Sequence, residues 1–416
     1  MRYLSESKGT GGAIKRSPQD FIVKEITKRG RIIEPDRVYT AEELGETEDK
    51  EGKFVTFVLQ KSEWNTIQAL QTVAKRLGRG VKSIGYAGMK DRNASTTQLA
   101  SIFGVDEKAV LGVVTKDIKI NGAWRSTEGV GMGELLGNSF EITINECDPT
   151  NIGKIAEELD SKMLNYFDAQ RFGNRLNNAK VGLHIMKGEL EEAVLEFLTA
   201  TTNENNKQAV EARKTLLEER DFARALEYFP GYLKAERTML YALSGEGTDY
   251  ARAIRSIPRG ISILFIHAVE ALIFNYETEI MAKEHSFEQA RLFCGHDLYG
   301  FPDMNSVSSE KKEIPVSTLI GYETDERAID DYQNEILENL GINRESFKIK
   351  SMPELSMRGA HRPIITPIKD FGYEAGENSL KVRFSLPSGS YATILIGEIT
   401  KSDPLDLSLV APELKI

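Results

Sequence analysis

The hydrophobic pattern of the chain changes twice along its length, and this constrains the fold more than any other feature. Up to about Tyr166, short runs such as 54–59 are rich in β-branched and aromatic residues, which is typical of strands. From about 174 to 359, longer patterns with charged faces, such as 189–198 and 208–228, are typical of helices. The closing segment, 379–399, returns to strand character and predicts a hairpin.

A chain of 416 residues favours two or three hydrophobic cores over a single one. The pattern predicts an α+β protein in which a terminal hairpin pairs with the sheet of the first block. Residues 1–166 and 360–416 would then form one discontinuous domain, and 167–359 would form an inserted, helix-rich domain. The sequence alone does not prove this pairing.

The cellular context follows from cysteines and apolar stretches. Cys147 and Cys294 form no CxxC or Cys/His spacing, so neither a disulfide framework nor a structural zinc is indicated. Residues 1–12 lack the apolar core of a secretory signal. The longest apolar stretch, 260–274, is shorter than the roughly 20 residues that a membrane-spanning helix needs. We expect a cytoplasmic protein with no membrane segment and a core helix over 260–283.

The net charge of −10 argues mildly against nucleic acid as a partner, because phosphate binding needs Lys and Arg. The segment 75–92 is nevertheless basic and contains a single acid, Asp91. Such an island can focus a favourable field on RNA. By charge count alone, a solvated helix end and loop explains it equally well. Its cations are Lys75, Arg76, Arg79, Lys82, Lys90 and Arg92.

The segment 85–98, GYAGMKDRNASTTQ, is the densest candidate for chemistry. Its glycines give the backbone freedom for a tight turn, and Asp91 lies between two cations that favour its ionised form. An ionised carboxylate suits a nucleophile or a proton acceptor. On composition alone, a β-turn with solvated charges is the better interpretation, because charged turns are common.

Spacing argues against several other chemistries. A Walker A loop has a Ser or Thr after its Lys, whereas Asp91 follows Lys90. No GxSxG elbow, HExxH helix or EF-hand pattern occurs elsewhere. We expect no metal, because the histidines show no ligand spacing. They are His184, His267, His285, His296 and His361.

Residues 88–98, GMKDRNASTTQ, resemble the GxKDxxAxTxQ signature of the TruD family of tRNA pseudouridine synthases, with every fixed position present. Other segments also resemble the family and occur along the chain in the expected order. They are DFIVKE at 20–25, GNSF at 137–140, NYFDAQRFG at 165–173 and FSLPSGSYAT at 384–393. The resemblance covers nearly the whole chain and is weakest over 174–359. Asp168 stands where many members have Gly.

The resemblance implies a pseudouridine synthase fold, with a mixed, largely antiparallel sheet flanked by helices and an inserted TRUD domain. It implies isomerisation of uridine to pseudouridine in tRNA, at position 13, without a cofactor. Asp91 matches the catalytic position of the family. Three routes remain open for it: attack on the sugar, attack on the base, or removal of a sugar proton.

The resemblance also implies residues around a flipped base. Phe140 would stack on the base, Asn138 would support that loop, and Phe21 would form a nearby apolar wall. Read without the family, both phenylalanines are ordinary core residues at the start of a strand. Candidate phosphate contacts, which position RNA without reading its sequence, are Lys75, Arg76, Arg79, Lys90, Arg92 and Arg171.

Two other functions fit parts of the sequence. An RNA-binding or RNA-chaperone module could keep the shape without the chemistry, although an intact Asp91 counts against it. A glycosidase needs two facing carboxylates. Only one acid, Asp91, lies in a segment that is a candidate for chemistry. We therefore predict a tRNA pseudouridine synthase that binds tRNA, needs no protein partner and acts as a monomer.

Overall fold

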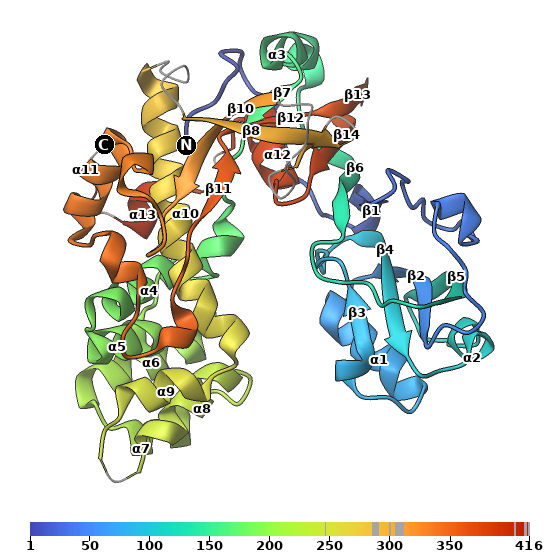
Figure 1. Ribbon diagram of the computed structural model, residues 1–416. Coiled ribbons are helices and arrows are strands. Elements are labelled where there is room, and N and C mark those ends of the chain that lie inside the picture. Colours follow the sequence, from blue (N-terminus) through green and yellow to red (C-terminus); the bar gives the residue numbers. More distant parts are fainter. Residues whose placement is uncertain are drawn as a thin grey trace.

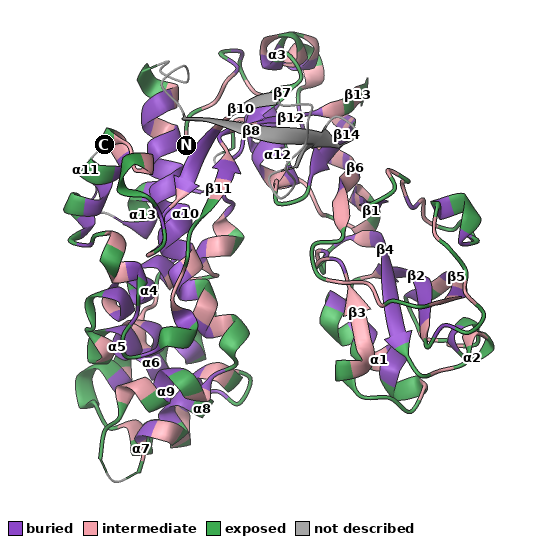
Figure 2. Cartoon of the chain, viewed as in Figure 1, coloured by how far each residue is buried: buried purple, intermediate pink, exposed green. Residues whose placement is uncertain are grey.

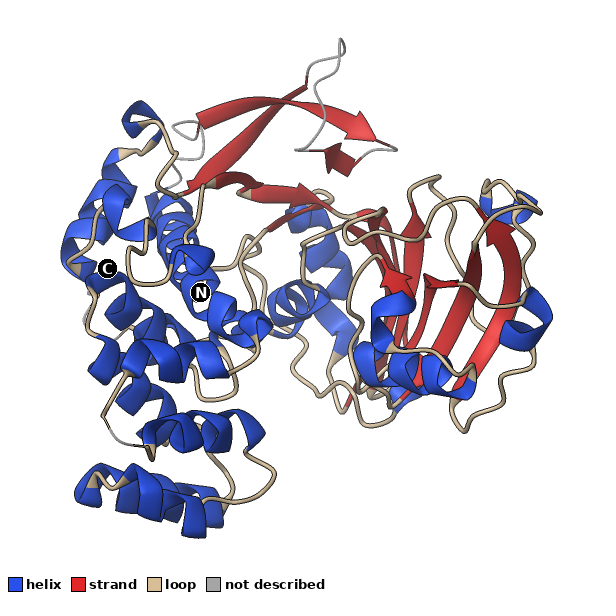
Figure 3. Ribbon diagram, turned by 60° about the horizontal axis from the view of Figure 1, so that its bottom comes forward, coloured by secondary structure: helices blue, strands red, loops and turns tan. Residues whose placement is uncertain are grey.

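The computed structural model describes residues 1–245, 247–284, 291–298, 301–303, 312–402, 405–411 and 414. Figure 1 shows two lobes that meet where the C-terminal strands lie. The turned view of Figure 3 shows that the strands of one large sheet occupy one lobe, whereas helices fill most of the other. The predicted α+β class is confirmed.

An eight-stranded sheet organises the first lobe in the described part of the chain. The order is β13-β14-β6-β1-β4-β2-β5, and β3 pairs with β4 beside this path. The neighbours β1 and β4 are parallel, and the other pairs are antiparallel. The strands are β1 (Phe21–Thr27), β2 (Phe54–Ser62), β3 (Ile84–Tyr86), β4 (Ser95–Phe103), β5 (Ile118–Ser126), β6 (Leu135–Asn145), β13 (Lys369–Ala375) and β14 (Ser379–Pro387).

Helix α1 (Thr66–Arg76) covers one face of the β2 and β4 region. It begins after Asn65, whose side chain accepts a hydrogen bond from the Ile67 N–H, and Gly78 follows its end with a φ of 66°. A second apolar cluster that includes Leu44 and Trp124 packs beside Val58 and Leu99 of the same strands. Two further short helices of this part are α2 (Glu107–Leu111) and α3 (Ile152–Leu159).

The C-terminal segment returns to the first sheet. Strand β14 pairs with β6 from Ser379 opposite Asn145 to Pro387 opposite Gly137, so the predicted pairing with the first block is confirmed for these residues. The second half of the predicted hairpin is wrong, because residues Ala392–Thr400 form helix α12. This helix is buried on almost every side. It therefore carries no amphipathic period, and its Ile-rich composition imitates a strand.

Helices α4 to α11 form most of the second lobe. The single helix predicted over 208–228 is instead two helices, because the chain turns at Arg220, with a φ of 53°. Asp221 then caps the next helix by accepting a hydrogen bond from the Arg224 N–H. The helices are α4 (Asn178–Lys187), α5 (Leu190–Thr199), α6 (Lys207–Glu219), α7 (Phe222–Tyr228), α8 (Lys234–Leu243), α9 (Tyr250–Ser256), α10 (Arg259–Glu284) and α11 (Asp331–Leu340).

Helix α10 is the central element of this lobe and runs along its length (Figures 1 and 2). By length and composition alone it could cross a membrane, but 72% of its most apolar window is buried inside the protein. Side chains from α4 and α5, such as Val181 and Phe197, belong to the same apolar cluster as Phe265 and Val269 of α10. The predicted core helix is thus confirmed.

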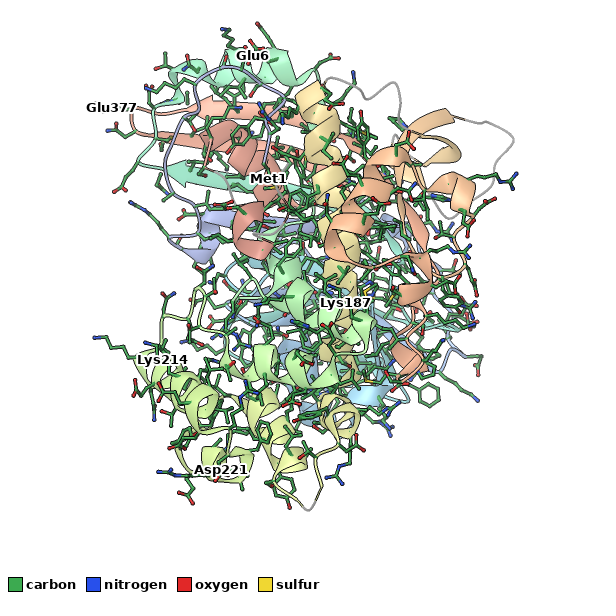
Figure 4. All side chains as sticks on the ribbon, turned by 90° about the vertical axis from the view of Figure 1, so that its left-hand side faces the viewer. Met1, Glu6, Lys187, Lys214, Asp221 and Glu377 are labelled. Atoms are coloured by element: carbon green, nitrogen blue, oxygen red, sulfur yellow. The ribbon has the colours of Figure 1, made fainter. Side chains whose placement is uncertain are left out.

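Two small sheets and the N-terminal segment complete the fold. Strands β7 (Lys162–Leu164) and β12 (Ile365–Pro367) pair with each other. The second small sheet contains β8 (Arg291–Leu298), β9 (Phe301–Asp303), β10 (Lys312–Leu319) and β11 (Ala360–Pro363). The short C-terminal helix is α13 (Leu407–Val410). Figure 4 shows Glu6 near α3, at the end of the molecule opposite Lys214 and Asp221.

Candidate active site

The loop 87–94, between β3 and β4, carries Asp91 and is tied to its neighbours through its backbone. Thr66, the first residue of α1, accepts a hydrogen bond from the Lys90 N–H at 2.9 Å. Gln98 of β4 donates from Nε2 to the Gly88 carbonyl at 3.1 Å. Thr66 and Gln98 both belong to regular elements, so the sheet and α1 define the path of the loop.

Lys61, on β2, forms a third set of hydrogen bonds to the main chain of the loop. Its ammonium donates to the main-chain carbonyl of Asp91 at 2.8 Å and lies 3.4 Å from that of Lys90. Lys61 is only 1% exposed. Burial lowers the pKa of Lys61 to about 8, although the charge of Asp91 acts in the opposite direction.

The carboxylate of Asp91 is held by two side chains from distant parts of the sequence. Lys15 Nζ donates to Asp91 Oδ2 at 2.9 Å. Gln170 Nε2 lies 3.5 Å from the other oxygen, Oδ1. The Asp91 side chain is 29% exposed. The group is therefore oriented from both sides and can still meet a ligand.

Lys15 reaches Asp91 from a backbone conformation that non-glycine residues seldom adopt, with a φ of 60°. Its ammonium also lies 4.2 Å from the ring centroid of Phe21. Strained backbone of this kind persists where surrounding contacts hold it, and it is concentrated at functional sites. Lys15 thus links the carboxylate to the aromatic side chains of the sheet.

The structure corrects the predicted role of Lys90 as a phosphate contact. Its side chain is 3% exposed, and its ammonium forms an ion pair of 2.7 Å with the buried Glu25 of β1. Glu25 also accepts a hydrogen bond from the Leu99 N–H, at 2.9 Å. Lys90 therefore points into the protein, where it anchors the loop to β1 and β4. A charge count cannot tell such a buried cation from a solvated one.

The predicted base-binding phenylalanines lie in an aromatic group beside the site. The rings of Phe21 and Phe140 meet edge to face at 6.4 Å, and Phe140 stacks with Phe384 at 5.3 Å. All three are at most 6% exposed, so they also belong to the core of the sheet. Asn138 lies two residues before Phe140 on β6, and among the described atoms its Oδ1 is buried without a hydrogen-bond partner.

Asp168 fixes the short helix η5 (Ala169–Phe172), from which Gln170 projects. Its carboxylate accepts hydrogen bonds from the Ala169 N–H at 2.6 Å and from the Thr393 hydroxyl at 2.9 Å. Burial raises the pKa of Asp168, and the neighbouring charge of Asp91 adds to this effect. Asp168 therefore joins the start of α12 to the segment that reaches Asp91.

The other predicted phosphate contacts are spread over the surface. Arg92 is exposed beside Asp91, and Lys75, Arg76 and Arg79 are exposed around the end of α1. Arg79 donates to the Gly104 carbonyl. Solvent access is thus consistent with RNA contact for these residues, and Arg92 belongs to the same loop as Asp91.

Arg171 lies next to Gln170 and lines a cavity of about 850 Å³ between the two lobes. Its guanidinium lies 5.1 Å from the Phe167 ring, and among the described atoms its Nε has no hydrogen-bond partner. Cations from both lobes line the cavity, while Glu134 and Glu270 are its acids. The cations are Lys28, Arg171, Arg358 and Arg362.

Residues of the cavity wall contact the loop that carries Asp91. The Gly133 N–H donates to the Ala87 carbonyl at 2.7 Å, and Leu135 packs against Gly88. At the back of the cavity, Arg362 donates to the Asn165 carbonyl at 2.8 and 3.0 Å. Burial lowers the pKa of Arg362 to about 9. The walls therefore combine buried positive charge with a direct connection to the loop.

Within the described ranges, the structure contains no cluster of three or more His, Cys, Asp or Glu side chains that could hold a metal ion. His184 pairs with Glu189 and His267 with Glu270, each at 2.7 Å. Cys147 is buried and free. The side chains of Cys294, His285 and His296 lie outside the described residues.

The sequence analysis missed Lys15, Lys61 and Gln170. They lie far from Asp91 in the sequence and contact it only in the folded protein. Lys15 and Gln170 are 76 and 79 residues away from Asp91 in the chain. Gln170 lies within the NYFDAQRFG segment, which carried a usable signal. Lys15 and Lys61 carried none beyond being cations near predicted strands.

Comparison with known proteins identifies the family of the chain. The model of the family described as "tRNA pseudouridine synthase D (TruD)" matches residues 1–291 and 300–399. A "Probable tRNA pseudouridine synthase D" of Methanosarcina acetivorans is 30% identical over 98% of this chain and 96% of its own length. A protein of the same name from Thermococcus sibiricus is 32% identical over 96% of this chain and 97% of its own.

A solved structure extends the similarity to the fold. The crystal structure described as that of the "Putative tRNA pseudouridine synthase D (TruD)" from Methanosarcina mazei superposes with a TM-score of 0.73 at 27% identity. The match covers 97% of each chain. Since the family model and the relatives each span almost the entire sequence, the chain belongs to the TruD family of tRNA pseudouridine synthases.

Proposed function

We propose that the protein isomerises uridine to pseudouridine in tRNA, at position 13, using Asp91 and no cofactor. The observation that carries the proposal is the Asp91 carboxylate, held at 2.9 Å by Lys15 and still 29% exposed, within a loop that matches the whole signature. Family membership supports the reaction type. The position in tRNA follows from the resemblance of the motifs.

The reaction requires no group that the site lacks. The bond from ribose carbon 1′ to N1 breaks, a bond from carbon 1′ to carbon 5 forms, the proton on carbon 5 leaves, and N1 gains a proton. Atoms and electrons balance within the nucleoside, so one carboxylate can act first on the sugar or base and later help to move the proton. Lys15 keeps Asp91 oriented for these steps.

Asn138 and Phe140 are proposed to hold the flipped base. The buried Oδ1 of Asn138 has no hydrogen-bond partner among the described atoms, and uracil offers a matching donor at N3. Phe140 would present a ring face once the base enters, with Phe21 and Phe384 supporting it. A buried acceptor without a donor is costly, which favours a ligand that supplies one.

The cavity between the lobes is proposed to take the RNA backbone beside the flipped nucleotide. Its cations come from both lobes, and the buried Nε of Arg171 has no hydrogen-bond partner among the described atoms. This location gives the acidic protein a local positive surface. The proposal includes the division into a discontinuous domain, 1–166 with 360–416, and an inserted domain, 167–359. It also includes a cytoplasmic, monomeric enzyme.

The direct test is incubation of the purified protein with an unmodified tRNA pool, followed by chemical mapping of pseudouridine. We expect a new site at position 13 and no requirement for added cofactor, with EDTA causing no loss. Pseudouridine at another position only would retain the reaction and reject the site. The absence of product across the homologous tRNA pool would refute the proposed function.

Replacing Phe140 by Leu is expected to lower the turnover of bound tRNA by roughly 5- to 100-fold, because aromatic stacking on a base contributes about 1–3 kcal/mol. Leu keeps the core filled, whereas Ala would leave a cavity costing about 3–5 kcal/mol. Single-turnover rates and binding constants measure the two effects separately. Phe57→Leu, in another core cluster of the same sheet, is the matched control. Weaker binding with unchanged turnover would contradict the stacking role.

Replacing Arg171 by Ala is expected to weaken tRNA binding about equally for all tRNA sequences and to reduce the salt slope of binding by about one. The reason is loss of a single phosphate contact in the cavity. Binding titrations between low and physiological salt provide the measurement. Arg224→Ala, on the exposed helix α7, should leave the slope unchanged. An unaltered slope for Arg171→Ala would exclude the contact.

A further inference from the structure

Lys61 holds the main chain of the catalytic residue itself. Its ammonium donates to the Asp91 carbonyl at 2.8 Å, while the ties from Thr66 and Gln98 reach Lys90 and Gly88. Lys61 lies in the rigid strand β2, between β4 and β5. Lys61 therefore restrains the main chain from which the Asp91 carboxylate projects.

Asp91 is the negative charge that acts on the Lys61 ammonium, because the nearby Glu25 is paired with Lys90. Lys90, in the loop above, is a second buried cation, and Glu25 of β1 neutralises it at 2.7 Å. The strand neighbours of Lys61 are Thr96 on β4 and Ile118 on β5, and neither carries a charge. The Lys61 ammonium is thus directed to the carbonyls of the loop and to the field of Asp91.

A purely structural role explains this arrangement poorly. Burying an ammonium is costly unless it is well paired, and a neutral side chain could fill the same space. The pKa of Lys61 falls to about 8, mainly through burial, so the folded protein releases this proton more readily than the unfolded chain does. At neutral pH the charge therefore opposes folding, and this opposition declines as the pH rises from about 8 towards the ordinary lysine value of 10.5.

We propose that Lys61 is a positioning residue of the isomerisation, whose charged ammonium fixes the Asp91 main chain and whose deprotonation weakens this hold. The inference rests on the proposed function, because it concerns the same carboxylate. A neutral amine can still donate to the Asp91 carbonyl, but the hydrogen bond loses the positive charge that strengthens it, so Asp91 occupies its productive position less often. Turnover should fall in alkaline solution while tRNA binding remains.

The test compares wild type, Lys61→Met and Lys61→Arg in single-turnover assays with saturating enzyme from pH 6 to pH 9.5. We expect Lys61→Met to react about 100-fold more slowly at pH 7 with unchanged tRNA affinity, because a displacement of about 1 Å can cost that much. Its rate should no longer fall where that of wild type falls. Lys61→Arg keeps a charge that does not titrate in this range, so it should restore most of the rate and abolish the alkaline fall.

The unfolding temperature of the variants distinguishes a positioning role of Lys61 from a purely structural one. Lys61→Met should unfold at the same temperature as wild type or higher at pH 7, since it removes a charge that opposes folding. The control Lys24→Met removes another buried sheet lysine, which pairs with Glu34 and Glu141. That variant should lose stability and keep its turnover.

Several outcomes would overturn the inference. They are a turnover of Lys61→Met within threefold of wild type, the same alkaline fall in the Met variant, or loss of activity that follows loss of folding. If Lys61→Arg does not fold, the pH profile and unfolding temperature of Lys61→Met decide. A wild-type protein that forms no pseudouridine defeats the proposed function instead, so the two failures remain distinct.

Discussion

Asn in place of Asp91 is expected to slow pseudouridine formation by about a thousand-fold or more, because a positioned carboxylate of this kind contributes roughly 10²–10⁴-fold to proton transfer alone. Asn has the same shape and can still accept the Lys15 hydrogen bond that measures 2.9 Å in the protein. It cannot act as a nucleophile or a base at neutral pH. The loss should therefore lie in the chemical step.

Binding and folding of this variant should remain close to wild type. The Asp91 to Lys15 pair is partly exposed, and such pairs contribute about 0–1 kcal/mol. Affinity for tRNA should stay the same or rise slightly, since a negative charge leaves the RNA site. Single-turnover assays with excess enzyme and separate binding titrations distinguish these effects.

The matched control is Asp36→Asn, which removes an aspartate paired with Lys119 at 2.5 Å on the exposed surface. It should react at the wild-type rate. Full turnover of Asp91→Asn would remove Asp91 from the mechanism and show that another group carries the chemistry. A loss shared equally by both variants would indicate a general effect of charge.

The local part of the site could be predicted from the sequence, because its information lies in contiguous residues. The signature segment 88–98 ends within a strand, β4, which spans Ser95–Phe103. The predicted hairpin partner of the first block emerges as β14, since alternation at Leu380, Val382 and Phe384 fixes one buried face. Periodicity and motif spacing report such features directly.

The remainder of the site depends on tertiary contacts that no local pattern records. Gln170 reaches Asp91 because Asp168 and Thr393 hold its short helix in place. Lys15 does so from a left-handed backbone conformation in a segment without periodicity. The exchange of a predicted strand for α12 has the same origin, because burial from all sides overrides the β propensity of its isoleucines.

Two arginines of the helical lobe share the buried carboxylate of Glu236, on α8. Its Oε1 accepts hydrogen bonds from Arg213 at 2.7 Å and Arg175 at 3.0 Å. The Arg213 side chain is 0% exposed, and Glu204 approaches it only to 3.7 Å. Removing one partner from a buried ion pair leaves uncompensated charge and costs about 3–5 kcal/mol. Glu236→Gln should therefore destabilise this lobe by that amount.

The pH dependence of stability gives an independent signature. Burial alone would raise the pKa of Glu236, but the hydrogen bonds from Arg213 and Arg175 outweigh it, and the pKa is lowered below its ordinary value of 4.5. The stabilisation is thus complete above about pH 4.5 and is lost as the pH falls through the lower, folded value. Glu236→Gln should lack this contribution, so its stability should fall less steeply in acid.

Thermal and denaturant unfolding, followed by circular dichroism of the helices from pH 3 to pH 7, measures both effects. Glu219→Gln is the control, because it breaks the partly exposed pair with Arg224 and should cost less than about 1 kcal/mol. Below its unfolding transition, Glu236→Gln should retain wild-type turnover, since Asp91 and its donors belong to other elements. A loss below 1 kcal/mol would show that Glu204 and the main-chain carbonyl of Leu198, which accepts from Arg213 at 2.7 Å, compensate the buried charge without Glu236.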